Sequence, residues 1–211
     1  DILNSAAGAK GVIDLLLDDV ANIDKEMVSL AQAAIFGLIE EIKKQKQLLA
    51  VESREYTIAP ITLQGSELLR LVASEYRNHP VARDKTINID PTSCNIQVFS
   101  DYTLLRRVLI KMTINALEST SRGGKITIGL DKQNDSAVFW VKNSQIMPDA
   151  IQLQIFKRSF STKGKDRGLG TYSIKLLTEN YLGGEVGFSS QEPDGTIFWI
   201  KLKIETTAQF Q

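Results

Sequence analysis

The chain has few of the residues that would place it in an oxidising compartment or against a polyanion. It contains one cysteine, Cys94, which excludes an intrachain disulfide and leads us to expect a reducing, cytoplasmic environment. Its 25 basic and 25 acidic side chains cancel, so no net positive field attracts nucleic acid or an anionic membrane. No apolar run approaches the roughly 20 residues of a membrane-spanning helix, and no signal peptide is visible. Because the chain starts inside a helical pattern, we expect it to be the soluble part of a longer protein.

The first 52 residues have the apolar spacing of two α-helices. Steps of three and four residues give each helix one heptad seam, with a turn predicted at 21–24. One hairpin cannot cover all the apolar positions around these seams, so we predict a four-helix bundle made by two copies of the chain. The alternative is a hairpin packed on the rest of the chain. The seams consist of Ile2, Ala6, Ala9, Ile13, Leu16 and Val20, and of Val28, Ala31, Ile35, Leu38, Ile42, Gln45 and Leu49.

From residue 56 onward the pattern changes to strands that alternate with helices. This order predicts a layered α/β sandwich with a mixed sheet. The whole chain is therefore assigned to the α+β class, with a helical hairpin at 1–52 and a sandwich domain at 56–206. The predicted strands are 55–61, 85–90, 95–100, 125–130, 137–142, 185–190 and 195–204, and the predicted helices are 65–78, 101–119 and 172–181.

A loop rich in glycine and hydroxyl groups precedes the last predicted helix. Its glycines, Gly164, Gly168 and Gly170, let backbone N–H groups approach a phosphate closely, and the helix N-terminus adds about half a positive charge. Lys163 and Arg167 add full charges. The pattern is typical both of a phosphate-binding lid and of a flexible surface loop of the same composition, and the motifs around the loop favour the lid.

Asn115 lies in the apolar C-terminal half of the helix predicted at 101–119. A buried Asn has two donor and two acceptor positions to satisfy, so it is costly without a partner. The partner is either a nearby backbone group or a bound ligand. A small-residue turn at 121–124, two strands, an aromatic pair and the glycine-rich loop follow this helix in that order.

With these motifs in this order, the chain resembles the histidine kinase branch of the GHKL ATPase superfamily. Asn115 corresponds to the N box, Phe156 and Phe160 to the F box, and Gly168 and Gly170 to the G2 box. The resemblance covers about the last 150 residues. It implies the ATP-binding sandwich of that superfamily, with ATP and Mg²⁺ as cofactors.

The resemblance also implies roles for individual residues. Asn115 matches the residue whose carbonyl oxygen, a suitable ligand for a hard cation, holds the Mg²⁺ that bridges the phosphates. Asn143 stands where the family usually has an aspartate that accepts from the adenine amino group, and Thr196 matches a hydroxyl beside the adenine. The other expected nucleotide-binding residues are Lys111, Phe156, Phe160, Thr162, Lys163, Gly164, Arg167, Gly168, Leu169 and Gly170.

Three positions depart from the family pattern. Lys111 replaces the usual first Asn of the N box, where it either pairs with phosphate oxygens or obstructs the metal. The same position is a glutamate base in the hydrolytic members of the superfamily, so Lys111 argues against a dedicated ATP hydrolase. Asn143 keeps an acceptor oxygen but loses the charge of the aspartate. The segment 144–148 is one residue shorter than the usual G1 box and has Gln145 in place of its first glycine.

The N-terminus resembles the end of a His-Asp-x-x-Asn phosphoacceptor box. Asp1 would hold one ring nitrogen of the acceptor histidine and take its proton, and Asn4, one turn later, would tune the transfer. The histidine itself is expected just before Asp1. The only histidine present, His79, precedes Pro80, which predicts a surface turn and not an acceptor.

The resemblance implies the core of a sensor histidine kinase in a two-component system. Such a core transfers the γ-phosphoryl group of ATP to a stem histidine and then to an aspartate on a response regulator receiver domain. The expected partners are therefore a second copy of the chain, bound through residues 1–52, and a receiver domain. The alternative is a degenerate nucleotide-binding or dimeric signalling scaffold without kinase activity, which Lys111, Asn143 and Gln145 motivate.

Overall fold

The computed structural model describes residues 56–77, 79–157 and 170–204, together with eight positions between residues 8 and 35. The chain divides into two compact units, residues 1–57 and 58–211. All eight positions are helical; Ala31 is buried, whereas Ile13, Val28 and Ile35 are 41–42% exposed. The rest of the predicted hairpin at 1–52 lies outside the described residues.

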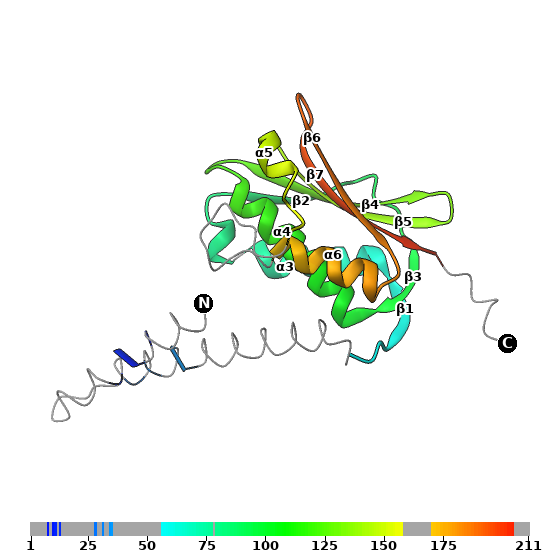
Figure 1. The fold of residues 1–211 in the computed structure, drawn as a ribbon, viewed down its shortest axis with the longest axis horizontal. Coiled ribbons are helices and arrows are strands. Elements are labelled where there is room, and N and C mark those ends of the chain that lie inside the picture. The colour runs from blue at the N-terminus through cyan, green and yellow to red at the C-terminus, as the bar shows by residue number, and fades with distance from the viewer. Residues whose placement is uncertain are drawn as a thin grey trace. The chain divides into compact units, whose positions relative to one another are not determined.

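A five-stranded sheet forms one layer of the second unit (Figure 1). Its strands lie in the order β2-β4-β5-β7-β6. β2 pairs with β4 in parallel and the other three pairings are antiparallel, which confirms the predicted mixed sheet. The strands are β2 Thr86–Ile89, β4 Lys125–Gln133, β5 Ser136–Asn143, β6 Glu185–Gln191 and β7 Gly195–Lys203.

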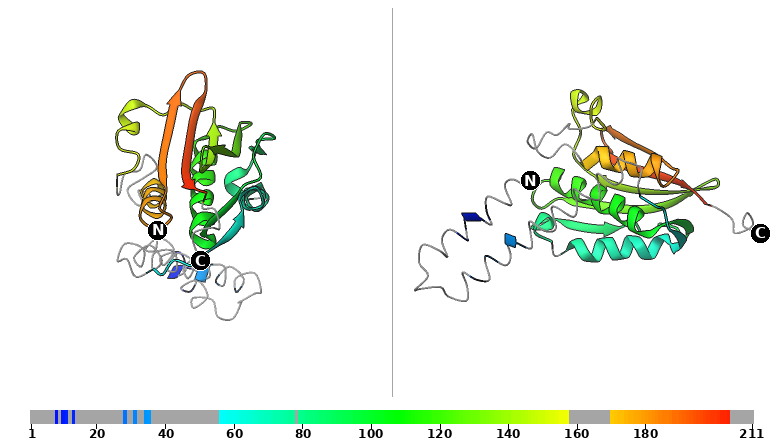
Figure 2. Two further views of the ribbon diagram at one scale, coloured as in Figure 1. Left: turned by 90° about the vertical axis from the view of Figure 1, so that its right-hand side faces the viewer. Right: turned by 60° about the horizontal axis from the view of Figure 1, so that its bottom comes forward.

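Three helices cover one face of this sheet (Figure 1 and Figure 2). They are α3 Gly65–Arg77, α4 Tyr102–Ser119 and α6 Gly170–Asn180. α3 packs on β2 and β4, α4 on β5, and α6 on β6. Along β5, Phe139 and Val141 are buried on the helix side, whereas Trp140 between them is partly exposed on the other. The layered α/β sandwich predicted from the sequence is confirmed.

Two tryptophans and two glycines form a row across the other face of the sheet. Trp140 and Trp199 are directly opposed on β5 and β7. On the neighbouring strands, Gly129 of β4 lies opposite Trp140, and Gly187 of β6 lies opposite Trp199. A Cβ added at Gly129 or Gly187 would lie 2.2 Å from the adjacent indole. Each indole therefore covers a glycine, which explains why these strand interiors carry no side chain there.

Side-chain hydrogen bonds hold both ends of α4, the helix that carries Asn115. At its start Asp101 is the N-cap: one carboxylate oxygen accepts from the Leu104 N–H and the other from the Ala59 N–H, both at 3.0 Å. At its end the Lys85 ammonium donates to the Leu117 carbonyl at 2.6 Å, and its charge opposes the negative helix end. The position of Asn115 in the fold is fixed from both sides.

A second, two-stranded sheet lies at the start of this unit. It pairs β1 Pro60–Gln64 with β3 Gln97–Asp101 in antiparallel register. The strand predicted at 55–61 is therefore wrong in its bounds, because pairing with β3 decides which residues become strand. The short helices η2 Pro80–Ala82 and α5 Asp149–Gln152 were not predicted. Within the described parts of the chain, no helix combines the length and apolar character that crossing a bilayer requires.

Candidate functional site

Three polar side chains form a row across the helix-covered face of the sheet. Asn143 at the end of β5 opposes Thr196 near the start of β7, and Thr196 opposes Ser190 near the end of β6. Directly opposed residues share a face, with Cβ atoms about 5 Å apart. Asn143 and Thr196 are each only 6% exposed. Such buried polar groups need hydrogen-bond partners, and this row finds them in α4 and in the segment that follows β5.

The carboxamide of Asn143 is held by two hydrogen bonds. Its Nδ2 donates to the Ala116 carbonyl of α4 at 3.3 Å, and its Oδ1 accepts from the Gln145 N–H at 3.1 Å. These partners fix the orientation of the amide, because a carbonyl can only accept and a backbone N–H can only donate. Asn143 keeps one N–H and one oxygen lone pair beyond these two bonds.

Thr196 and Ser190 belong to one ordered chain of hydrogen bonds. Thr196 donates its hydroxyl proton to the Gln145 carbonyl at 2.6 Å. Because that proton is committed, Ser190 must be the donor in the 2.7 Å contact between the two hydroxyls. The Ser190 oxygen in turn accepts from the Met147 N–H at 2.7 Å. The row therefore fastens residues 145–147 to β6 and β7.

Asn115 and Gly170 meet where α4 and α6 pack together. A Cβ added at Gly170 would lie 3.4 Å from Asn115 Oδ1 and 3.8 Å from its Nδ2. The Asn115 Nδ2 is buried and makes no hydrogen bond, so the donor side of the amide has no structural partner. Gly170 is the first residue of α6, whose N-terminus carries a partial positive charge. The Asn115 carbonyl oxygen, a suitable ligand for a hard cation such as Mg²⁺, thus lies beside the N-terminus of α6, which favours an anion such as phosphate.

Lys111 lies one turn before Asn115 on α4, and both side chains are half-buried. This spacing puts them on one face of the helix. Of the remaining predicted site residues, the following lie outside the described residues: Asp1, Asn4, Phe160, Thr162, Lys163, Gly164, Arg167, Gly168 and Leu169.

Phe156 lies in an aromatic cluster on β6 and β7. Its ring centroid is 5.9 Å from that of Phe188 and 6.2 Å from that of Phe198. The Lys175 ammonium of α6 lies 5.9 Å from the Phe156 centroid, within reach of a cation–π contact. The Thr171 hydroxyl donates to the Ile155 carbonyl. These contacts tie together the two flanks of the predicted lid, residues 155–156 and 170–175.

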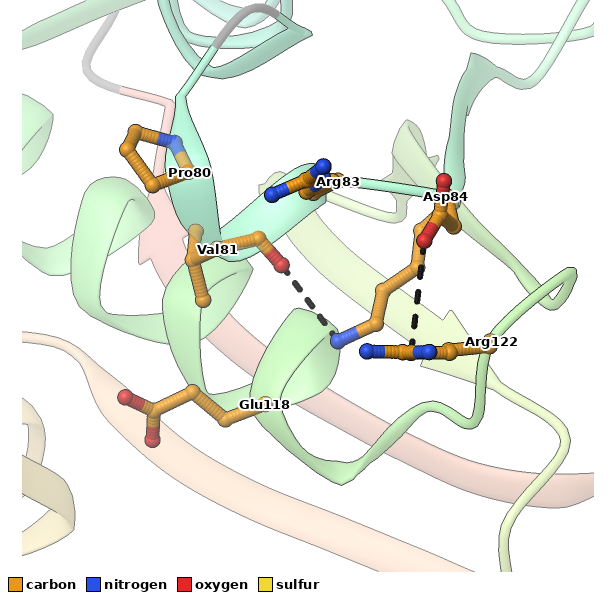
Figure 3. A pocket seen from close by; sticks show the side chains of 7 residues that line it. Pro80, Val81, Arg83, Asp84, Glu118 and Arg122 are labelled. Carbon is orange, nitrogen blue, oxygen red and sulfur yellow. Dashed lines mark hydrogen bonds and ion pairs between the residues drawn. The ribbon is translucent and has the colours of Figure 1, made fainter.

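A surface hollow of about 450 Å³ lies beside η2 and the end of α4 (Figure 3). None of the predicted site residues lines it. The Lys85 ammonium donates there to the Val81 carbonyl at 3.3 Å as well as to α4, and Arg122 faces Asp84 at 4.0 Å. Lys85 therefore connects η2 to the end of α4. The hollow is lined by Pro80, Val81, Arg83, Asp84, Lys85, Glu118 and Arg122.

Residues 100–206 match the family of histidine kinase-, DNA gyrase B- and HSP90-like ATPases. The chain belongs to this family. The stretch contains every described residue of the site, from Lys111 and Asn115 to Thr196. The resemblance to a histidine kinase catalytic core is confirmed by the relatives of the chain as well as by the family match.

The chain is similar to known sensor kinases in sequence and in fold. It is 30% identical to the sensor histidine kinase ZraS of Klebsiella oxytoca over 64% of this chain and 29% of that protein. The histidine kinase AdeS of Acinetobacter baumannii shares its fold over 96% of both chains, with a TM-score of 0.73 and 17% identity. A third neighbour is the histidine kinase ThkA, solved in complex with the response regulator protein TrrA. It has a TM-score of 0.67 and 23% identity, over 97% of this chain and 59% of that one. The chain spans between 29% and 52% of the length of the curated relatives that it matches.

Ser190 is a residue of the site that the sequence did not indicate. It appears only as one of several polar residues in a strand, and its partner Thr196 lies on the next strand. Pro193, Asp194 and Gly195, residue types typical of turns, stand between the two predicted strands 185–190 and 195–204 and could have indicated the pairing. A tight turn sets the register of a hairpin, and that register puts residue 190 opposite residue 196.

Proposed function

We propose that the chain binds Mg-ATP and serves as the catalytic core of a sensor histidine kinase. In this proposal residues 56–206 hold the nucleotide and residues 1–52 form the dimer stem. The γ-phosphoryl group passes to a stem histidine expected just before Asp1, and then to an aspartate of a response regulator. The family match over residues 100–206 supports the nucleotide-binding role.

The observation that carries this proposal is the meeting of Asn115 with Gly170. A structural Asn at this depth would have bonded its amide to the protein, yet the Nδ2 has no partner. The amide faces the first residue of α6, which follows the predicted lid. We infer that Asn115 holds the metal through its carbonyl oxygen, while the start of α6 and the lid residues bind phosphate oxygens.

The residues of the chain would act mainly by placing the nucleotide. Bound Mg²⁺ supplies charge neutralisation on the phosphates. Asn143 and Thr196 would hold the base at the end of the sheet, and Thr162, Lys163 and Arg167 would bind the phosphates. Asp1 would hold the acceptor histidine so that its free nitrogen forms the N–P bond while the bond between the γ-phosphorus and the bridging oxygen of ADP breaks.

A dimer through residues 1–52 is part of the proposal. Val28 and Ile35 are seven residues apart and lie on one seam, yet each is more than 40% exposed in the single chain. Apolar side chains repeated on one helical face favour burial against another helix. The response regulator partner is proposed from the family alone.

The scaffold remains the second candidate, favoured by one observation. Asn143 already satisfies part of its amide within the protein, through Ala116 and Gln145, without a ligand. A side chain in that role can be kept for the fold after nucleotide binding is lost. A scaffold of this kind would dimerise but bind no nucleotide.

Titration calorimetry separates the two candidates. We expect the chain to bind ATP, and to bind it more tightly when Mg²⁺ is present. A longer form of the protein that includes the residues before Asp1 should then incorporate labelled phosphate from ATP into a histidine. Absence of binding at millimolar ATP would leave only the scaffold.

A further inference from the structure

The hydrogen bonds inside the polar row determine what it can still offer to a ligand. Asn143 donates one N–H to the Ala116 carbonyl and accepts the Gln145 N–H with one lone pair of its oxygen. An amide has two N–H groups and two lone pairs, so one donor and one acceptor remain. The side chain is 6% exposed, so its remaining donor and acceptor lie in a largely dry setting.

Thr196 can only accept. Its proton is committed to the Gln145 carbonyl at 2.6 Å, and one lone pair receives the Ser190 hydroxyl. A second lone pair is left on the Thr196 oxygen. Because Asn143 and Thr196 are opposed on β5 and β7, the row offers one donor beside two acceptors.

Both kinds of purine edge match this set. A 6-aminopurine presents an N–H donor at position 6 and an acceptor at N1, whereas a 6-oxopurine presents an acceptor at position 6 and a donor at N1. Because the orientation of the Asn143 amide is fixed, a 6-oxopurine would lie shifted relative to a 6-aminopurine, so that each base pairs its acceptor with the Asn143 N–H and its donor with Asn143 or Thr196. We propose that this base site takes 6-oxopurine nucleotides about as readily as adenine nucleotides. The proposal rests on the nucleotide-binding function given above.

An aspartate at position 143 would behave differently. A carboxylate only accepts, so together with Thr196 the row would offer acceptors alone. The 6-oxo group would then face a lone pair at a position that is only 6% exposed, where an unpaired polar group is most costly. Asn143 is therefore the residue that determines the base preference.

The test uses the whole chain and two probes, ATP and inosine triphosphate, each titrated with Mg²⁺ by calorimetry. Inosine triphosphate has the 6-oxo group and the N1–H but no 2-amino group, so the hydrogen-bond pattern is tested without added bulk. We expect the two dissociation constants to agree within about tenfold. A larger difference would mean that one of the two bases leaves a hydrogen-bonding group unpaired. A larger preference for ATP overturns this inference and leaves the proposed function intact. Binding of neither probe overturns both.

The substitution Asn143→Asp tests the residue itself. We expect it to shift the ratio of the two dissociation constants toward ATP by about tenfold or more. Asn134→Asp, in the exposed turn between β4 and β5, is the matched control and should leave the ratio unchanged. Thermal melting shows whether the Asn143→Asp variant is folded. If the variant does not fold, the ratio of the two dissociation constants for the unaltered chain still tests the proposal. A folded variant with an unchanged ratio would remove Asn143 from base recognition.

Discussion

Asn143 donates its side-chain N–H to the backbone carbonyl of Ala116, at 3.3 Å, and so joins the end of β5 to the last turns of α4. Ala116 is the residue next to Asn115. The residue proposed to bind the base and the residue proposed to bind the metal therefore share one support. A shift of α4 against the sheet would move both, so we expect substitutions at this joint to alter base binding and metal dependence together.

Replacing Asn115 by alanine distinguishes a ligand-binding Asn from a structural one. The Nδ2 has no partner, so the substitution breaks no hydrogen bond donated by this amide, and we expect stability to change by less than about 1 kcal/mol. Mg-ATP affinity should fall by about tenfold or more, because a charge-assisted contact is lost. Calorimetry and thermal melting give the two numbers. Asn88→Ala, at an exposed position of β2, is the control. A large loss of stability with unchanged affinity would make Asn115 a structural residue.

Replacing Ser190 by alanine should break the hydroxyl chain. The Met147 N–H loses its acceptor and the Thr196 oxygen loses a donor, so we expect a loss of about 1–2 kcal/mol in the free energy of unfolding. Ser189→Ala is the matched control, because Ser189 is the exposed neighbour on the opposite face of the same strand. Urea denaturation of the two variants provides the comparison. Equal stability of both would show that the hydroxyl chain contributes nothing.

The Gly129 and Trp140 pair predicts a steric cost that a second substitution relieves. A Cβ at position 129 would lie 2.2 Å from the indole, so Gly129→Ala forces the ring to move and should cost about 1–3 kcal/mol. In a Trp140→Leu background the same change should cost much less, because the shorter side chain leaves space. A double-mutant cycle in urea measures this coupling. Additive effects would contradict the arrangement of the row.

Much of the second unit could be predicted because its elements are long and strongly patterned. The periodic apolar residues of α4 predicted that helix within one residue of its observed bounds, and the residue in excess, Asp101, is its N-cap. The predicted strands 185–190 and 195–204 form a hairpin whose turn lies at 192–194, and Gly195, which follows it, has a φ of 83° that favours glycine. The strand β1 was misplaced, because its bounds depend on β3, which comes more than thirty residues later. Four residues of α5 are too few for a periodic pattern.

The sequence named the residues of the candidate site but not the hydrogen bonds between them. Asn115, Asn143 and Thr196 were named through the resemblance to the family, and their roles toward a nucleotide stay predictions. The orientation of the Asn143 amide could not be predicted, because it depends on the Ala116 carbonyl, which belongs to a helix packed across the sheet. Phe156 was predicted to bind nucleotide, and in the structure its ring contacts are with Phe188 and Phe198. Its role toward a nucleotide stays a prediction.

The stem prediction can be tested by placing charge on its exposed seam. Val28→Glu combined with Ile35→Glu puts two carboxylates on one helical face, where burial without partners costs several kcal/mol. We expect light scattering to find a dimer for the unaltered chain and a monomer for the double variant at tens of micromolar. Leu153→Glu, at a residue that is 80% exposed in the second unit, should leave the dimer intact. A monomeric unaltered chain would disprove the stem.

Lys111 is the position where the family pattern and this chain disagree most directly. It lies one turn before Asn115, and both side chains are half-buried, so an ammonium group shares the helical face of the proposed metal ligand. A lysine stem is long enough to reach past a metal to a phosphate oxygen, so we expect Lys111 to attract the nucleotide and to replace part of the metal's contribution. Lys111→Asn should then weaken ATP binding without metal and increase the dependence on Mg²⁺.

Calorimetry with and without Mg²⁺ measures both effects of Lys111→Asn. Lys132→Asn, an equal loss of charge at an exposed residue near the end of β4, controls for long-range electrostatics and should change neither affinity. The opposite result is tighter Mg-ATP binding with unchanged affinity in the absence of metal. That outcome would mean that the ammonium obstructs the cation, and it would favour the scaffold over the kinase, because a chain that keeps such an obstruction does not depend on rapid phosphoryl transfer.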